Sequence, residues 1–227
     1  MSYGRPILRR LAYLRRNRCS VLLAALCLFI LVNPIVVGSV AGAAFLALGT
    51  LAILLLGLWA LHARRSTLWA LGVLALLTVQ GIAADRLGAH WLRPATLVGT
   101  AVFMGAVTIA LLRYVLDWHS ISTDKVFGAV AAYVLIAFTF ACLFGLLQEV
   151  AGQSFASSVQ ASDPLDWPTL MYFSFTVLTS TGFGEIIPVS RMARSLIIIE
   201  QVLGVMYVAF LVARLANLYG GRAPRGS

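Results

Sequence analysis

The sequence predicts an all-α membrane protein with six transmembrane helices and a shorter re-entrant half-helix between the fifth and the sixth. Hydrophobic residues make up 61% of the 227 residues and charged residues only 11%, at a mean hydropathy of +0.94, a balance far from that of soluble domains. Six apolar segments reach the roughly 20 residues that a helix needs to cross the hydrocarbon core. A further apolar stretch, residues 167–178, is too short to cross it.

The order of segments predicts four parts of the chain. A basic arm at 1–18 precedes a four-helix transmembrane domain at 19–116, and a second domain at 117–220 is followed by a tail at 221–227. Asn33-Pro34 and Gly38-Ser39 predict a tight turn after the first span. Asp166 and Pro168 are start signals for the half-helix. The six spans cover approximately 19–37, 40–62, 67–84, 95–115, 125–148 and 193–218.

Basic residues predict the orientation. The net charge is +9, but the arginines fall between apolar runs, which argues against a contiguous face for nucleic acid. Six of them lie in the N-terminal arm. Because basic residues favour the cytoplasmic side, we expect a multi-pass protein of the inner cell membrane with both termini in the cytoplasm. The arm either lies along anionic lipid or serves only as a topology signal.

Side chains with catalytic spacing are missing from the sequence. No H-E-x-x-H motif or pair of acids within a span occurs. The three cysteines, Cys19, Cys27 and Cys142, have no metal-ligand spacing. We therefore expect no enzyme activity, no cofactor and no small-molecule substrate.

Residues 179–185, "TSTGFGE", follow the half-helix directly. Irregular backbone at membrane depth is tolerated only where it lines water or is buried in protein. Glycine permits the unusual backbone angles that turn successive carbonyl oxygens to one side, and rings of such oxygens replace the hydration water of a cation. The negative end of the half-helix dipole favours the same cation. One chain carries one such loop, so a closed ring predicts a symmetric homotetramer.

The longer stretch "YFSFTVLTSTGFGEIIP" resembles the pore loop of the potassium channel superfamily, whose filters read T-T-V-G-[YF]-G-[DE]. It is most similar to bacterial two-helix pore domains and two-pore-domain channels. Pro188, Arg194 and Gly204 stand where that superfamily commonly places such residues. The resemblance implies a potassium-selective channel with K⁺ as the permeant ion, a pore domain at 117–220, and a voltage-sensor-like position for the helices at 19–116.

The resemblance also implies the roles of individual residues. K⁺ would bind the carbonyls of Thr181, Gly182 and Phe183 and the carbonyl and hydroxyl of Ser180. Glu185 would hydrogen-bond behind the filter and hold cations at its mouth, while Glu200, an acid within a span, is either functional or a neutral brace. The expected filter residues are Thr179, Ser180, Thr181, Gly182, Phe183 and Gly184. The expected supporting residues are Tyr172, Phe173, Thr176, Glu185, Arg194 and Glu200.

Departures from the family pattern predict a looser filter. Thr181 replaces valine, and its hydroxyl needs a partner, for which Thr176 is nearest in sequence. Phe183 replaces the commoner tyrosine and Phe173 a tryptophan that often bonds with it. We expect a cuff held by packing rather than by hydrogen bonds, with weaker rigidity. A channel that passes both Na⁺ and K⁺ is therefore the alternative.

One face of the sixth span predicts a gate. Val205, Val208, Val212 and Ala216 share an apolar face, which can stop ions by expelling water. Gly204 would be a hinge. These residues could instead only pack against neighbouring helices.

The fourth span predicts the absence of strong voltage gating. Arg93 precedes it and Arg113 ends it, so it lacks the ladder of gating charges that steep voltage dependence needs. A non-conducting accessory subunit that uses the fold only for assembly is an alternative of another class.

Overall fold

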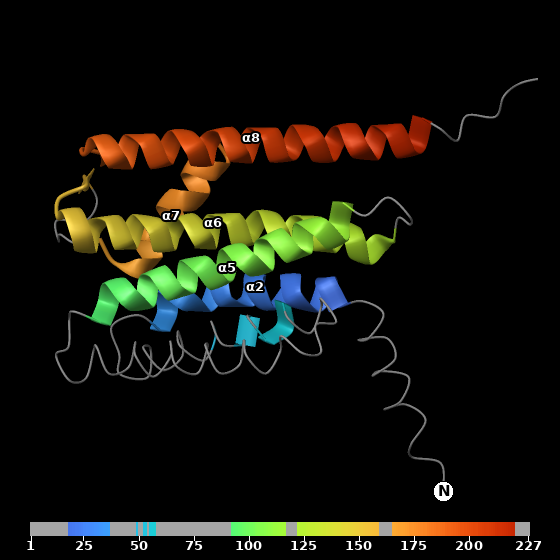
Figure 1. Ribbon diagram of the computed structural model, residues 1–227, viewed down its shortest axis with the longest axis horizontal. Coiled ribbons are helices and arrows are strands. Elements are labelled where there is room, and N and C mark those ends of the chain that lie inside the picture. Colours follow the sequence, from blue (N-terminus) through green and yellow to red (C-terminus); the bar gives the residue numbers. More distant parts are fainter. Residues whose placement is uncertain are drawn as a thin grey trace, which may run out of the picture.

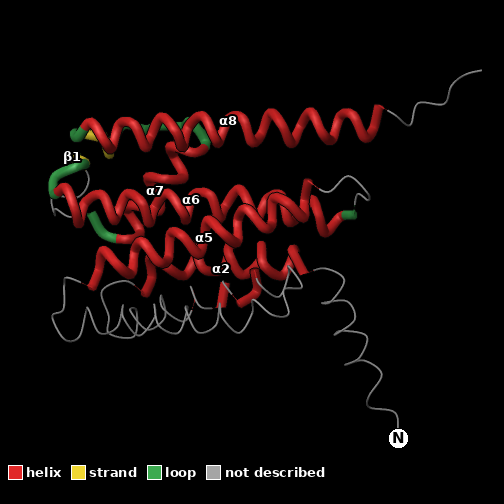
Figure 2. The backbone as a smooth tube through the Cα atoms, viewed as in Figure 1, coloured by secondary structure: helices red, strands yellow, loops and turns green. Residues whose placement is uncertain are grey.

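The computed structural model describes residues 18–36, 49, 52–53, 55–57, 92–116, 122–158 and 165–220. These ranges form helices and one small two-stranded sheet (Figure 2). The predicted third span, nearly all of the arm and the tail lie outside the described residues, and so does most of the second span. The elements are α2 (Arg18–Val36), α5 (Leu92–Leu116), α6 (Thr123–Ala151), β1 (Phe155–Ser157), α7 (Trp167–Leu178), β2 (Ile186–Pro188) and α8 (Arg191–Gly220).

Helix α6 lies at the centre of the molecule. It contacts α2 and α5 on one side and α7 and α8 on the other, and α7 lies between α6 and α8 (Figure 1). Among the described residues, three helices are long and apolar enough to cross a membrane: Arg93–Leu116, Thr123–Ala151 and Arg191–Arg214. The apolar part of α2, Arg18–Asn33, is shorter. The described fold is therefore that of an all-α membrane protein.

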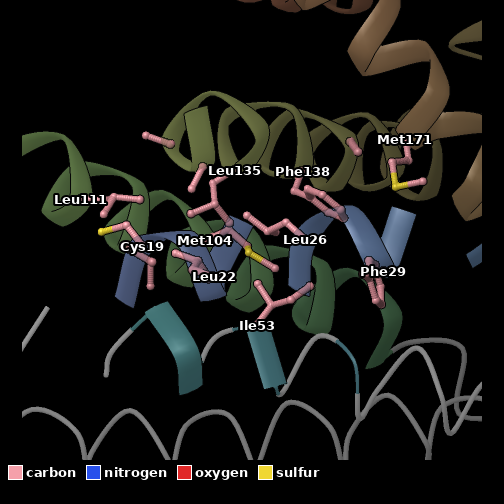
Figure 3. Close-up of a cluster of buried hydrophobic side chains, with 14 residues drawn as sticks. Cys19, Leu22, Leu26, Phe29, Ile53, Met104, Leu111, Leu135, Phe138 and Met171 are labelled. Atoms are coloured by element: carbon pink, nitrogen blue, oxygen red, sulfur yellow. The ribbon is translucent and has the colours of Figure 1, made fainter. Parts of the chain in front are cut away.

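A buried apolar cluster joins the N-terminal helices to α6. Leu22 and Leu26 of α2 meet Met104 of α5, and Leu135 and Phe138 of α6 close the cluster (Figure 3). Met171 of α7 also contributes to it. This contact ties α7 to the same core that holds the first helices.

Helix α2 covers nearly all of the predicted first span, but it has no turn at Asn33-Pro34. We expected a tight turn at Asn33-Pro34, but the helix continues to Val36. A proline removes one backbone hydrogen bond, and helices in membrane proteins tolerate it where neighbouring groups satisfy the released carbonyl. The Asn33-Pro34 prediction was therefore wrong.

Three helices meet at the beginning of α6. Asp124 Oδ1 accepts a hydrogen bond from the backbone amide of Cys19 at 2.9 Å, near the first residue of α2. Asp124 Oδ2 accepts from the hydroxyl of Tyr114 on α5 at 3.4 Å. A carboxylate stabilises a helix N-terminus because the first amides have no partner within the helix. Asp124 thus joins α2, α5 and α6 at one end of the bundle.

Helix α7 covers the residues predicted for the half-helix. Asp166 caps its first turn and accepts from the amide of Thr169 at 3.0 Å, and Pro168 stands within that turn. Its 12 residues span about 18 Å at 1.5 Å per residue, which is too short to cross the hydrocarbon core. It ends at Thr179, where the candidate site begins.

Candidate functional site

The loop after α7 alternates in backbone handedness. Ser180, Gly182 and Gly184 have φ of 56°, 55° and 88°, whereas Thr181 and Phe183 lie outside the positive region. Such alternation rotates successive peptide planes in opposite senses, so that successive carbonyl groups face one side of the strand. We expected this conformation of the glycines alone. Ser180 adopts it at a cost of about 1–2 kcal/mol for a residue with a Cβ; its place two residues before Gly182 is the signal that could have revealed it.

Backbone amides fold the loop onto the end of α7. The amide of Thr179 donates to Phe175 O at 3.0 Å and that of Ser180 to Val177 O at 2.9 Å. The amides of Thr181 and Gly182 both donate to the carbonyl of Thr176, at 2.9 Å and 3.2 Å. These bonds satisfy helix-terminal carbonyls that would otherwise lack a partner. They also turn the donor side of the loop toward the helix.

The carbonyls on the other side of this loop are available to a ligand. In the described part of the chain, no hydrogen bond is accepted by the carbonyls of residues 179–184. The flanking carbonyls are both occupied, because Leu178 O accepts from the hydroxyl of Tyr133 at 3.1 Å and Glu185 O accepts from the amide of Ser158 at 2.9 Å. Backbone carbonyls are strong acceptors that normally find a partner. The six carbonyls of residues 179–184 are therefore free of partners among the described residues.

The two threonine hydroxyls at the start of the loop pair with each other. Thr179 Oγ1 donates to Phe175 O at 2.7 Å and lies 2.8 Å from Thr181 Oγ1. Since a hydroxyl has one hydrogen to give, Thr181 donates in the second contact. Thr176, the partner expected for this hydroxyl, instead donates its own to Phe173 O at 2.8 Å. That expectation was wrong, because the nearer helix carbonyl takes the proton, and Thr176 supports the loop through its carbonyl.

Tyr172 supports the outer half of the loop in two ways. Its hydroxyl donates to Glu185 Oε2 at 2.8 Å, and its ring stacks on Phe183 with centroids 6.4 Å apart and an interplanar angle of 6°. The hydrogen bond to Glu185 is the main cause that raises the pKa of Tyr172. We expected a cuff of packing alone, yet it includes this hydrogen bond.

Phe173 lies on the other side of α7 and packs away from Phe183. Its ring centroid is 5.3 Å from that of Phe144 and 5.5 Å from that of Phe155. The structure therefore does not bring Phe173 and Phe183 together within one chain. Arg194 lies in the first turn of α8, where its Nε donates to Pro188 O at 3.4 Å.

Glu200 of α8 is completely buried against α7. Its Oε1 is hydrogen-bonded to the hydroxyl of Ser174, and that hydroxyl also lies 2.8 Å from the carbonyl oxygen of Ala137 on α6. A carbonyl can only accept, so Ser174 gives it its one hydrogen. Glu200 must then supply the proton of the other contact, which makes it a neutral acid bracing α6, α7 and α8.

Removing the Glu200 donor should destabilise this contact. Glu200→Gln keeps a donor of similar size, so we expect a small change. Glu200→Ala removes one of the two partners of the buried Ser174 hydroxyl and lowers the free energy of unfolding by about 1–3 kcal/mol. Thermal unfolding of both variants in lipid nanodiscs measures the difference. If Gln proves as damaging as Ala, Glu200 acts through a negative charge and the neutral assignment is wrong.

Gly204 allows α8 to approach the base of the loop. A Cβ at this position would overlap the carbonyl oxygen of Leu178, which is backbone and cannot move aside cheaply. Helix α8 continues through Gly204 without interruption. The structure thus gives Gly204 a close-packing role, and its role as a hinge stays a prediction.

The expected gate residues lie on a face of α8 that this chain leaves uncovered. Val205, Val208 and Val212 are 56%, 46% and 59% exposed, and Ala216 is exposed as well. Glu200 and Gly204 of α8 are packed against the rest of the chain instead. Gly204 stands one position before Val205, which corresponds to about 100° around the helix. Four copies could cover this face; a gate at these residues stays a prediction.

Several supporting residues were not found from the sequence. Tyr133 and Ser174 are polar residues in apolar helices, and polar groups at membrane depth are suspects by default. Tyr133 is held in place by Tyr207, whose ring stacks on it at 5.4 Å and whose hydroxyl donates to Ala129 O at 2.6 Å. Ser158 donates to Glu185 O through its backbone amide at 2.9 Å and through its hydroxyl at 3.4 Å, and the sequence offers no signal for the amide contact.

Comparisons with known proteins agree with this site. A family described as "Ion channel" matches residues 129–220, which cover α7, the loop, α8 and most of α6. The human protein "Potassium channel subfamily K member 5" is 30% identical over 81 residues, or 35% of this chain and 16% of that protein. The chain thus spans about a sixth of that relative's length. No solved structure matches. The similarity to ion channels thus covers this C-terminal segment of the chain.

Proposed function

We propose that this protein is a potassium-selective channel that carries K⁺ passively across the membrane. The observation that carries the proposal is the run of carbonyls at residues 179–184, which accept no hydrogen bond from any described residue. Their alternating backbone handedness suits a ring of oxygens that replaces the hydration shell of an ion. The ion sites would be Ser180, Thr181, Gly182 and Phe183, at the negative end of α7.

One chain supplies only one side of such a ring. A cation held by backbone carbonyls needs oxygens from several directions, so the proposed channel is a homotetramer with the loops around its axis. The largely exposed α8 supports this assembly: only 11% of its membrane-spanning window is buried within one chain. Lipid would cover the outer helices, and both termini would lie in the cytoplasm.

A cation channel that passes Na⁺ as well as K⁺ is the second candidate. The observation that favours it is Phe183, which lacks the phenolic hydroxyl of the commoner tyrosine and is held by stacking on Tyr172. The Tyr172–Glu185 hydrogen bond favours the selective channel, because it restrains the outer end of the loop.

We also infer weak or no voltage gating. Helix α5 covers the residues predicted for the fourth span. It contains two arginines, Arg93 and Arg113, one near each end. Arg93 lies 3.9 Å from Glu149 of α6. Steep voltage dependence requires about 3–4 gating charges in each subunit that move through the field.

Reconstitution into liposomes tests the proposal. We expect a tetramer that releases K⁺ down its gradient, at a rate exceeding that for Na⁺ by at least tenfold and varying little with membrane potential. Flux assays in matched K⁺ and Na⁺ gradients measure this ratio. Equal rates for the two ions would support the less selective candidate. A tetramer without flux would support the accessory subunit, and a monomer would contradict the channel.

A further inference from the structure

A small antiparallel sheet attaches the segment after α6 to the chain just beyond the filter. Phe155 pairs with Pro188, Ala156 with Ile187 and Ser157 with Ile186. Continuing this register places Ser158 opposite Glu185. The amide of Ser158 donates to Glu185 O at 2.9 Å, and at the other end the amide of Val189 donates to Ser154 O at 2.9 Å. The last residue of the filter motif is therefore hydrogen-bonded to this sheet.

The sheet is itself anchored in the apolar core. Phe155 of β1 and Ile186 of β2 are 5% and 7% exposed. The ring of Phe155 lies 5.4 Å from that of Phe144 on α6 and 5.5 Å from that of Phe173 on α7. Val177, near the end of α7, belongs to the same cluster. One cluster thus holds the chain immediately before the loop and immediately after it.

The far end of the same linker is also fixed to α6. The side-chain amide of Gln148 forms two hydrogen bonds with the backbone of Leu165: Leu165 N donates to Oε1 at 2.9 Å, and Nε2 donates to Leu165 O at 3.3 Å. Gln148 is buried, so these bonds are shielded from competition with water. Both described ends of the linker are therefore positioned by α6.

Glu185 is the point at which two restraints meet. Its side chain accepts from Tyr172, and its backbone carbonyl accepts from Ser158. The aromatic pair expected to brace this region is absent within one chain, because Phe183 carries no hydroxyl and Phe173 packs against Phe144 and Phe155. The sheet therefore restrains the backbone at Glu185, next to Phe183 and Gly184, where the contact between Phe183 and Phe173 is missing within one chain.

We propose that β1 and the residue that follows it, Ser158, form a clamp that determines ion selectivity, in which the amide of Ser158 positions Glu185 and thereby the outermost carbonyls of the filter. The proposal rests on the proposed channel function and deepens it. The clamp lies outside the filter and contributes no ligand to the ion; Ser158 is a positioning residue. It explains how a filter with an apolar cuff keeps its carbonyls at the spacing that distinguishes K⁺ from Na⁺.

Replacing Ser158 with proline removes the amide hydrogen and tests the clamp. Loss of one such hydrogen bond in each subunit is expected to lower the K⁺ to Na⁺ flux ratio about tenfold, with the tetramer intact by size. Ser158→Ala keeps the amide and removes only the hydroxyl, so its ratio should fall less than that of Ser158→Pro. An unchanged ratio in an intact Ser158→Pro tetramer would overturn the clamp.

A reversible crosslink separates a loosened clamp from a misfolded protein. Ala156 and Ile187 are directly opposed and exposed, and the Cα spacing of such cross-strand pairs lies within the range of disulfides. In Ser158→Pro with Ala156→Cys and Ile187→Cys, oxidation should restore the flux ratio and reduction should lower it again. Ser158→Pro with only the native cysteines, treated identically, is the control. A K⁺ to Na⁺ flux ratio that is the same after oxidation and after reduction would contradict the proposal.

The wild-type protein distinguishes failure of the clamp from failure of the channel. Absence of wild-type K⁺ flux contradicts the proposed function, whereas wild-type flux with an unaffected Ser158→Pro ratio contradicts the clamp alone. A second measurement needs no flux: K⁺ should raise the melting temperature of the wild type more than Na⁺ does, because ligands stabilise the state that binds them. Ser158→Pro should reduce this difference, and a full difference would overturn the clamp.

Discussion

Gly182→Ala is expected to lower K⁺ flux on the order of 100-fold, because four strained subunits act on one pore. The φ of Gly182 is 55°, a region that costs a residue with a Cβ about 1–2 kcal/mol in each chain. Apart from its two neighbours in the chain, no described residue has an atom within 4 Å of the added Cβ, so the penalty arises from the backbone. Relief of that strain rotates the peptide plane and moves a carbonyl out of the ring. Flux from liposomes that contain equal amounts of tetramer measures the loss.

Gly152→Ala is the matched control for this substitution. Gly152 has φ of 65°, its added Cβ also meets no atom within 4 Å, and it lies at the end of α6 outside the filter. Both variants should therefore lose similar amounts of thermal stability, and only Gly182→Ala should lose flux. Normal flux in Gly182→Ala would exclude the carbonyl filter, and equal loss in both variants would trace the effect to folding.

Gly204→Ala is the second substitution with a large expected effect. Its Cβ would overlap the carbonyl oxygen of Leu178, which also accepts the hydroxyl of Tyr133. Helix α8 would have to move away from α7, at a cost of about 1–3 kcal/mol for overpacking. We expect a lower melting temperature and reduced flux, because the displaced helix weakens both the Tyr133 contact and the Ser174–Glu200 contact.

Gly105→Ala provides the comparison in a helix where space is available. The nearest atom to its added Cβ is Thr139 Cγ2 at 3.8 Å, an ordinary contact, and alanine favours a helix over glycine by about 1 kcal/mol. The melting temperature of Gly105→Ala should equal or exceed that of the wild type. A Gly204→Ala protein that melts at the wild-type temperature would contradict the close contact at Leu178.

Local signals in the sequence predicted the elements best. Asp166 and Pro168 marked the beginning of α7 because a cap and a proline favour only the first turn of a helix. The apolar runs located α5, α6 and α8 to within a few residues, since hydrophobic length is set by the membrane itself. The turn expected at Asn33-Pro34 failed, because tertiary packing can carry a helix through a proline.

Contacts between distant segments were beyond the sequence. The motif predicted left-handed backbone at Gly182 and Gly184. It did not predict it at Ser180, because the alternation of φ at every second residue extends to Ser180 only when the whole loop is extended. The pairing of Ser158 with Glu185 joins two segments through backbone atoms, which every residue carries alike. Thr176 was predicted as the partner of the Thr181 hydroxyl because it is near in sequence. In the structure its hydroxyl donates to the carbonyl of Phe173 within the helix instead.

Helix α6 has a consequence for any stimulus that reaches this protein. It is hydrogen-bonded through Asp124 to the N-terminal helices at one end, through Tyr133 to the last residue of α7 in the middle, and through Gln148 to the linker at the other end. A tilt of α6 would therefore displace both ends of the proposed ion path together. A lateral pull by lipid on α2 or α5 would reach the proposed filter along this route.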